Sequence, residues 1–240
     1  MLSGLTQVLL PDLELSNYQE IVYQASVRGK TFFGYKLFAD TFSMPNIAQR
    51  LIGLTGGIAT GKTTVSNYLA DKYSLPILDA DIYAKEAVAS DSPILQTIFE
   101  RYGDRVKLPN GELNRSGLGD IIFNNLQEKQ WLEAQIHPFV RDRFTHELQQ
   151  TRSETVVLSI PLLFEANLTD TVTEIWVVSC DRALQIQRLE QRNGLTPEQA
   201  QARIDSQLPL AQKTALADLV LYNNAGLKEL YQQVDKAILS

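Results

Sequence analysis

Residues 51–70 read LIGLTGGIATGKTTVSNYLA, and this stretch decides the fold. Gly56 to Thr63 match G-x-x-x-x-G-K-[ST] at every fixed position, with an apolar run before the match and a helical run after it. The glycines let backbone N–H groups turn inward around a phosphate, and the following helix adds its positive N-terminal end. The stretch therefore predicts a nucleoside triphosphate site, although such loops serve kinases, switches, motors and transporters alike.

Length and composition bound the class of protein. The chain has 240 residues, of which 44% are hydrophobic, so it can form one substantial core with room for an inserted subdomain. A net charge of -6 argues against binding to nucleic acid or anionic lipid, which needs clustered Lys and Arg. The single cysteine, Cys180, cannot form an internal disulfide, and no apolar run is long enough to span a bilayer. We therefore expect a cytoplasmic monomer that binds neither nucleic acid nor membrane.

Residues 1–43 differ from the rest of the chain, because they are rich in aromatic side chains and lack a sustained helical or strand period. Two interpretations are open. The segment is an appendage that docks an aromatic surface on the main domain or on a partner, or translation naturally begins at Met44 and opens directly into the first strand. We favour the second interpretation and expect the segment to be loosely attached.

From Gln49 onward, strand and helix signals alternate, which predicts a parallel sheet covered by helices on both faces. The stretch from Ile82 to about Gln150 is mostly helical and is interrupted by a Pro-Asn-Gly turn. The expected strands are 50–55, 75–80, 154–164, 173–179 and 217–224.

Two side chains of the loop and two carboxylates point to phosphoryl transfer. Lys62 can reach the β- and γ-phosphates, and the Thr63 hydroxyl can bind Mg²⁺. Asp79 and Asp81 close the second strand, and ligands of an open parallel sheet lie beyond the carboxyl ends of its strands. A carboxylate there can orient an acceptor hydroxyl and take its proton. We predict that Asp81 is the base and that Asp79 caps the next helix or belongs to the metal shell.

Arginines and a histidine follow in the helical regions. Arg188 and Arg192 are four apart on one helix, so an anion between them and a solvated helix face are both open interpretations. The helix ends at Gly194, and the hairpin after it predicts a hinged lid that excludes water. His137 precedes a proline that would kink or restart its helix. Glu165 follows another strand, where substrate contact and simple capping are both open.

The class of phosphate-loop protein follows by comparison. A GTPase switch carries D-x-x-G and N-K-x-D, and neither string occurs in the sequence. A motor ATPase has an acidic residue at the end of the neighbouring strand, where this chain has Ser159. The remaining layout is that of a small-molecule kinase, with a nucleoside or nucleoside-monophosphate kinase as one version of it. The rival from another class is a regulator that senses ATP without transferring it, although a sensor needs neither the paired arginines nor Asp81.

The motifs also resemble a known family. IGLTGGIATGKTTVS, LDADIYAKEAV, LNRSGLGDIIF, LEAQIHPFVR, IPLLFE, QIQRLEQRNGLTPEQAQARIDSQLP and ADLVLYNNAGLKELYQQV are similar, in order and spacing, to dephospho-CoA kinase, over about residues 50–239. The resemblance implies transfer of the ATP γ-phosphoryl group to the ribose 3′-hydroxyl of dephospho-CoA, the last step of coenzyme A synthesis. It also implies a three-layer α/β fold of the nucleoside-monophosphate-kinase type, with a five-stranded parallel sheet. The helical acceptor subdomain would span about 83–150, and the lid about 182–215.

The same resemblance assigns roles to individual residues. It implies that Asp81, Lys62 and Arg188 are catalytic, that Thr63 binds Mg²⁺, and that ATP and dephospho-CoA are the ligands. The residues expected to contact dephospho-CoA are Thr55, Asp81 and His137. The residues expected to contact the nucleotide are Gly57, Ile58, Ala59, Thr60, Gly61, Lys62, Thr63, Thr64 and Arg192.

The chain departs from the family pattern in three places. Residues 1–43 have no counterpart. Ser159 replaces an acidic residue, so we expect Mg²⁺ to depend on Thr63, the phosphates and water. Ala59 and Thr60 replace a more usual Gly-Ser pair, so we expect the backbone there to need no positive φ.

Overall fold

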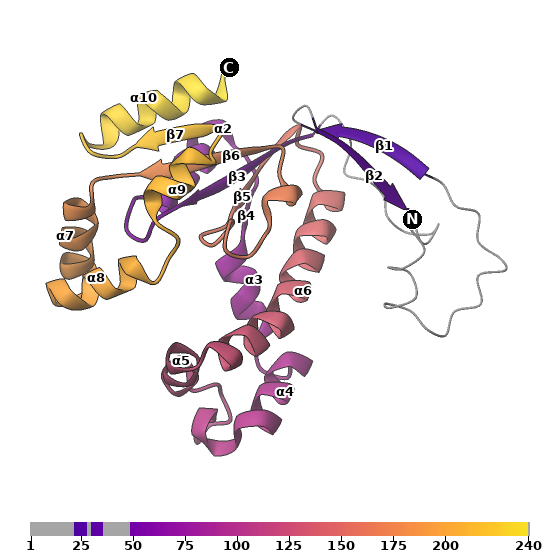
Figure 1. Cartoon of the computed structure of the whole chain (residues 1–240), viewed down its shortest axis with the longest axis vertical. Coiled ribbons are helices and arrows are strands. Elements are labelled where there is room, and N and C mark those ends of the chain that lie inside the picture. Colours follow the sequence, from indigo (N-terminus) through magenta and orange to yellow (C-terminus); the bar gives the residue numbers. More distant parts are fainter. Residues whose placement is uncertain (1–21, 28–29, 36–48, 240) are drawn as a thin grey trace, which may run out of the picture. The chain divides into compact units, whose positions relative to one another are not determined.

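The computed structural model describes residues 22–27, 30–35 and 49–239, which fall into two units, Met1–Met44 and Pro45–Ser240 (Figure 1). In the first unit β1 (Val22–Val27) and β2 (Lys30–Tyr35) pair as antiparallel strands. These two strands were not predicted, because the segment lacks a sustained strand period, although aromatic and β-branched residues favour strands even without strict alternation. The other expectations for residues 1–43 lie outside the described residues.

The second unit contains a five-stranded, entirely parallel sheet in the order β4-β5-β3-β6-β7. The strands are β3 (Arg50–Gly56), β4 (Ile77–Asp79), β5 (Thr155–Ser159), β6 (Glu174–Ser179) and β7 (Leu219–Tyr222). This confirms the predicted sheet. Strand β5 stops five residues before the expected end, because the chain reaches Pro161, which cannot donate to a strand ladder. The central position of β3 places the phosphate loop in the middle of the carboxyl edge.

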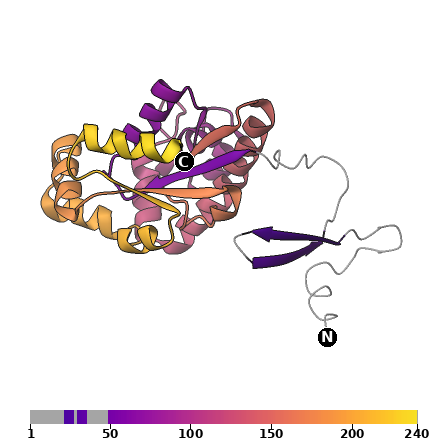
Figure 2. The same cartoon turned by 90° about the horizontal axis from the view of Figure 1, so that it is seen from above.

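Alternate residues of the strands face two separate hydrophobic layers. Figure 2 shows the sheet of the second unit lying between helices. On one face, odd-numbered residues of β3 and β6 such as Leu51 and Val177 pack with α3 (Ala80–Ala87) and the later part of α6 (Leu126–Gln150). On the other face, even-numbered residues of the same strands pack with α2 (Lys62–Tyr73) and α10 (Leu227–Ile238). The three-layer arrangement is therefore as predicted.

A helical insertion extends from the first of these faces. It consists of α4 (Pro93–Tyr102), the short 3-10 helix η1 (Gly103–Val106), α5 (Arg115–Asn124) and the beginning of α6. In Figure 1, α4 and α5 lie at the end of α3 and α6 that is far from the sheet. The insertion has its own core, formed by Val88, Leu95, Ile98, Val106, Leu113, Leu118 and Leu132. It is thus a small body attached to the sheet by two helices.

Two local predictions in the insertion have different outcomes. The tight turn at Pro-Asn-Gly is confirmed, because the Gly111 N–H donates to the Leu108 carbonyl at 2.9 Å. A restart of the helix at Pro138 is wrong, because α6 runs through it as one helix of 25 residues. Pro138 removes one backbone donor. Buried Leu132 and Val140 on either side nevertheless hold both halves in place.

The region after β6 forms a helical hairpin. Helix α7 (Arg182–Asn193) ends at Gly194 with φ 63°, and α8 (Pro197–Asp205) begins with a capping box between Thr196 and Gln199. The end of the first helix at Gly194 confirms the prediction. The next helix, α9 (Leu210–Ala215), was not predicted, because six residues show too little periodicity. A further 3-10 helix, η2 (Thr169–Thr171), precedes β6. Within the described part of the chain, no helix is both long and apolar enough to cross a membrane.

Candidate active site

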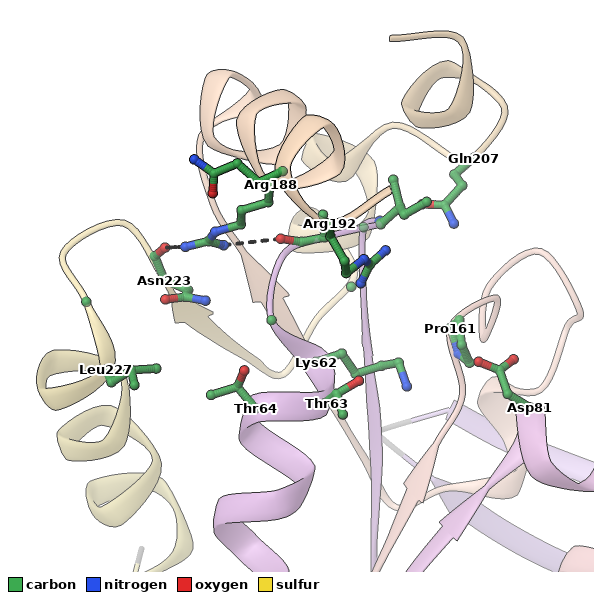
Figure 3. A pocket seen from close by; sticks show the side chains of 17 residues that line it. Lys62, Thr63, Thr64, Asp81, Pro161, Arg188, Arg192, Gln207, Asn223 and Leu227 are labelled. Atoms are coloured by element: carbon green, nitrogen blue, oxygen red, sulfur yellow. Dashed lines mark hydrogen bonds between the residues drawn. The ribbon is translucent and has the colours of Figure 1, made fainter. Parts of the chain in front are cut away.

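A cleft of about 780 Å³ opens at the carboxyl edge of the sheet, around the phosphate loop (Figure 3). The cleft contains most of the residues predicted from the sequence, whereas Thr55, Thr60 and His137 do not line it. The predicted residues that line it are Gly57, Ile58, Ala59, Gly61, Lys62, Thr63, Thr64, Asp81, Arg188 and Arg192. The structure therefore brings together side chains from three separate parts of the sequence.

The backbone of the phosphate loop is held in a demanding conformation. Gly61 has φ 105°, and a Cβ atom there would collide with the Asn223 side-chain amide, so glycine is needed. Ala59 has φ 61°, so our expectation that this position needs no positive φ is wrong. An alanine in the left-handed region costs about 1–2 kcal/mol. Contacts elsewhere must offset that cost, and one is the hydrogen bond of 3.1 Å from Arg188 to the Ala59 carbonyl.

Lys62 lies at the start of a short polar chain. Its Nζ donates to the Ser159 hydroxyl at 2.6 Å, and that hydroxyl donates to Asp79 Oδ2 at 2.7 Å. The Lys62 ammonium and the Asp79 carboxylate are 3.9 Å apart. Ser159 thus connects the lysine to a carboxylate from the neighbouring strand. The other oxygen of Asp79 accepts from the Asp81 N–H at 2.8 Å, which confirms the predicted helix cap.

Asp81 stands at the cleft wall in the first turn of α3. Partial desolvation, with the nearby charge of Asp79 added to it, raises the pKa of the Asp81 carboxyl, while Lys62 and Lys85 oppose the shift. A carboxylate with a raised pKa accepts a proton more readily than an ordinary one. In Figure 3 the Lys62 side chain extends toward the side of the cleft where Asp81 lies. The arrangement can hold a phosphate and activate a hydroxyl beside it.

The two arginines of α7 have different surroundings. Arg188 donates to the carbonyls of Ala59 at 3.1 Å, Thr60 at 3.3 Å and Asn223 at 3.0 Å, so it braces the phosphate loop. Arg192 is exposed, and among the described residues it donates only to the side chain of its neighbour Asn193, at 3.0 Å. Its guanidinium lies over the loop in Figure 3. The two interpretations, an anion between the arginines and a solvated helix face, therefore do not apply to both side chains equally. Arg188 is fixed against the phosphate loop, and Arg192 is available to a ligand.

The predicted residues outside the cleft are buried or remote from it. Thr55 is fully buried and donates to the Pro161 carbonyl at 3.1 Å. Pro161 itself lines the cleft, so Thr55 can affect the site through it. Thr60 is also buried and donates to the Gly57 carbonyl at 2.9 Å. His137 is half-buried in the middle of α6.

Several residues that sequence reasoning missed also shape the site. Glu165, whose role was left open, forms a 2.8 Å ion pair with the fully buried Lys213. Gln185 and Gln207 both contact Ile58 of the phosphate loop. Glu165 and Asn223 carried a signal, because each comes after a strand, where ligands of a parallel sheet gather. Gln185 stands in α7 and Gln207 follows α8, and neither has a distinctive pattern around it.

The site suits a magnesium ion that is held largely by phosphates. The Thr63 hydroxyl faces the cleft next to Lys62. Within the described residues, no group of three or more His, Cys, Asp or Glu side chains could hold a metal. Mg²⁺ commonly keeps several waters and binds nucleotide phosphates with few protein ligands, so the residues present fit that mode.

Comparison with known proteins gives a consistent result. The sequence model of the dephospho-CoA kinase family matches residues 50–229. The dephospho-CoA kinase of Trichormus variabilis is 58% identical over 192 residues, which are 80% of this chain and 98% of the relative. That of Synechocystis sp. is 60% identical over 190 residues, covering 79% and 94% of the two chains.

Solved structures agree. A crystal structure of a Thermus thermophilus protein superposes with a TM-score of 0.71 at 31% identity, covering 80% of this chain and 96% of that one. A dephospho-CoA kinase from Campylobacter jejuni gives a TM-score of 0.60 at 28% identity, with coverages of 79% and 95%. The matched motifs, the relatives and the shared kinase fold together show that this chain belongs to the dephospho-CoA kinase family, whose members phosphorylate dephospho-CoA with ATP in the last step of coenzyme A synthesis.

Proposed function

We propose that this chain transfers the γ-phosphoryl group of ATP to the ribose 3′-hydroxyl of dephospho-CoA, giving coenzyme A and ADP. The observation that carries the proposal is the cleft in which the phosphate-loop Lys62 and the carboxylate of Asp81 lie together. Family membership gives the acceptor, and the geometry gives a role to each group.

In the proposed step the 3′-hydroxyl oxygen attacks the γ-phosphorus. A bond forms between that oxygen and the phosphorus, and the bond from the phosphorus to the β–γ bridging oxygen breaks. The hydroxyl proton passes to the Asp81 carboxylate, and ADP leaves with the bridging oxygen. The raised pKa of Asp81 suits it to take this proton. Lys62 exchanges its contact with Ser159 for the β- and γ-phosphate oxygens, where its charge is needed.

The nucleotide would lie along the phosphate loop. Arg188 braces the loop backbone, whereas Arg192 is available to neutralise phosphate charge from above. Leu227 is 55% exposed and lines the cleft with Gly226, so it offers an apolar surface to the adenine. Figure 3 places Leu227 and Asp81 on opposite sides of Lys62. This arrangement directs the base of ATP to one side and its γ-phosphate to the other.

Magnesium would be held by the Thr63 hydroxyl, the phosphates and water, and when bound it neutralises charge on the transferring group. Thr63 is suited to this because its side chain is exposed to the cleft at the first turn of α2. Ser159 does not replace the usual acid directly. Its hydroxyl donates to Asp79, whose carboxylate would be the group to orient waters bound to the metal.

The domain roles follow the division of the fold. We assign residues 83–150 to acceptor binding, because this insertion has its own core and continues from α3, the helix that carries Asp81, and we assign 182–215 to the lid. His137 would shape the acceptor pocket from α6. Residues 1–43 would be dispensable for catalysis. We further propose a cytoplasmic monomer without nucleic-acid or membrane partners, in keeping with its net charge of -6.

The test is ADP release from Mg-ATP by the purified protein, with dephospho-CoA, adenosine, AMP or no acceptor. ADP formed only with dephospho-CoA, with coenzyme A as the second product, supports the proposal. Equal slow release in every tube would contradict it and favour an ATP-sensing regulator. Deletion of residues 1–43 should leave the rate with dephospho-CoA unchanged, and a loss of activity would give that segment a role.

A further inference from the structure

Gln207, which follows α8, is fixed in one orientation by the phosphate loop. Its side-chain oxygen Oε1 accepts from the Ile58 N–H at 2.8 Å. A backbone N–H can only donate, so the oxygen of the amide must face Ile58. The amide nitrogen Nε2, with its two N–H donors, must therefore face away from the loop.

The free end of Gln207 faces the cleft. Gln207 lines the cleft together with Pro161 and Asp81, and among the described residues no group accepts a hydrogen bond from its Nε2. In Figure 3 the amide nitrogen is turned toward the open space above Pro161 and Asp81. A pair of unused donors thus points to the part of the site where the γ-phosphate and the acceptor would meet.

The core of the protein anchors this side chain. The next residue, Leu208, donates its N–H to Glu165 Oε1 at 3.0 Å. Glu165 is paired at 2.8 Å with Lys213, whose side chain is fully buried. The Lys213 ammonium also lies 3.5 Å from the carbonyl of Gly56, the first residue of the phosphate loop. The side chain of Gln207 is therefore tied to the phosphate loop, and the residue after it is tied to the buried ion pair, while the Gln207 N–H donates to the Ile204 carbonyl of α8 at 3.2 Å.

Holding Ile58 in place does not by itself account for Gln207, because another residue already contacts Ile58. Gln185 on α7 is buried and donates to the Ile58 carbonyl at 2.7 Å. Donors oriented before the reaction stabilise charge that develops in a transition state, since no reorganisation is needed when the charge appears. A neutral amide can do this without the desolvation cost of a buried charge.

We propose that Gln207 is a further catalytic residue, whose Nε2 donates a hydrogen bond to an oxygen of the γ-phosphoryl group during transfer. The inference rests on the proposed function, because it assumes that the γ-phosphate lies between the loop and Asp81. It also makes a separate claim about nucleotides. A donor to the γ-phosphate should distinguish ATP from ADP, whereas a residue that only shapes the loop should affect both alike, because both place a β-phosphate there.

The test uses Gln207→Leu in the full chain, with Gln201→Leu on the exposed surface of α8 as the matched control. Calorimetric titration without acceptor gives the affinities for Mg-ATP and Mg-ADP, and turnover with dephospho-CoA gives kcat. For Gln207→Leu we expect kcat to fall about 10²-fold, the typical cost of one transition-state donor. ATP affinity should fall several-fold while ADP affinity stays within twofold of the unmodified protein. The control should match the unmodified protein in all three.

Equal losses of ATP and ADP affinity would overturn the inference, and so would a kcat within threefold of normal. If Gln207→Leu does not fold, Gln207→Glu replaces it, because a carboxylate can still accept from Ile58 but cannot donate. That variant should lower the ratio of ATP to ADP affinity, and an unchanged ratio would also overturn the inference. If the unmodified protein is inactive with dephospho-CoA, the proposed function fails, while the affinity ratio still tests Gln207.

Discussion

Replacement of the buried Lys213 by methionine should destabilise the fold, although the two side chains have similar volumes. The Lys213 side chain is fully buried, and its ammonium lies 2.8 Å from Glu165 and 3.3 Å from the Pro161 carbonyl. Loss of one partner from a buried ion pair costs about 3–5 kcal/mol, because the other charge remains without compensation. The Glu165 side chain is 25% exposed, so water can solvate part of the orphaned charge. We therefore expect a loss near the lower end, about 3 kcal/mol.

Urea unfolding of the unmodified protein, Lys213→Met, and the double variant Lys213→Met with Glu165→Gln measures the loss. The double variant removes the orphaned charge, so it should recover more than half of the lost free energy of unfolding. Lys228→Met, at an exposed position of α10, is the control and should change stability by less than about 0.5 kcal/mol. A loss below 1 kcal/mol in the single variant, or no recovery in the double variant, would refute the argument that the pair is an interdependent anchor.

Three further predictions concern the phosphate loop and the base. Lys62→Ala should abolish nearly all turnover with dephospho-CoA, and near-normal activity would contradict the role of the loop. Asp81→Asn should keep ATP affinity but lose most of kcat. Because desolvation raises the pKa of Asp81, activity should fall, as pH decreases, at a higher pH than the ordinary aspartate value of about 3.9. The base acts in its deprotonated form. If the pH–rate profile of Asp81→Asn keeps the same fall in activity at low pH, Asp81 is not the base. Ala59→Gly relieves about 1–2 kcal/mol of left-handed backbone strain in the folded protein. It also raises the conformational entropy of the unfolded chain, which lowers stability by about 0.4–1 kcal/mol. Urea unfolding should therefore show a small gain, and a clear loss would contradict the strain.

The sequence was sufficient for the sheet and for the main groups of the cleft, because their signals are local. Continuous burial along β3 follows from its apolar run, and the phosphate loop follows from its spacing. The conformation of Ala59 could not be predicted in this way. Its carbonyl is held by Arg188, which lies 129 positions later, and Ile58 is held by Gln207, 149 positions later. Such partners are set by the packing of the hairpin on the loop, and no local pattern records them.

Both ends of the proposed lid, 182–215, are consequently held by contacts with the phosphate loop. Gln185 and Arg188 fasten the start of α7 to Ile58 and Ala59, and Lys213 fastens α9 to Gly56. Between these anchors, the end of α7 and α8 contain the exposed Arg192 and the glycine stop at 194, where a hinge can act. Any closure over ATP should therefore move the segment around 190–206 while both ends stay in place. The fixed ends also hold Ala59 in its strained conformation, so the phosphate loop has its binding conformation before the proposed lid closes. We therefore expect that closure of the proposed lid serves to exclude water.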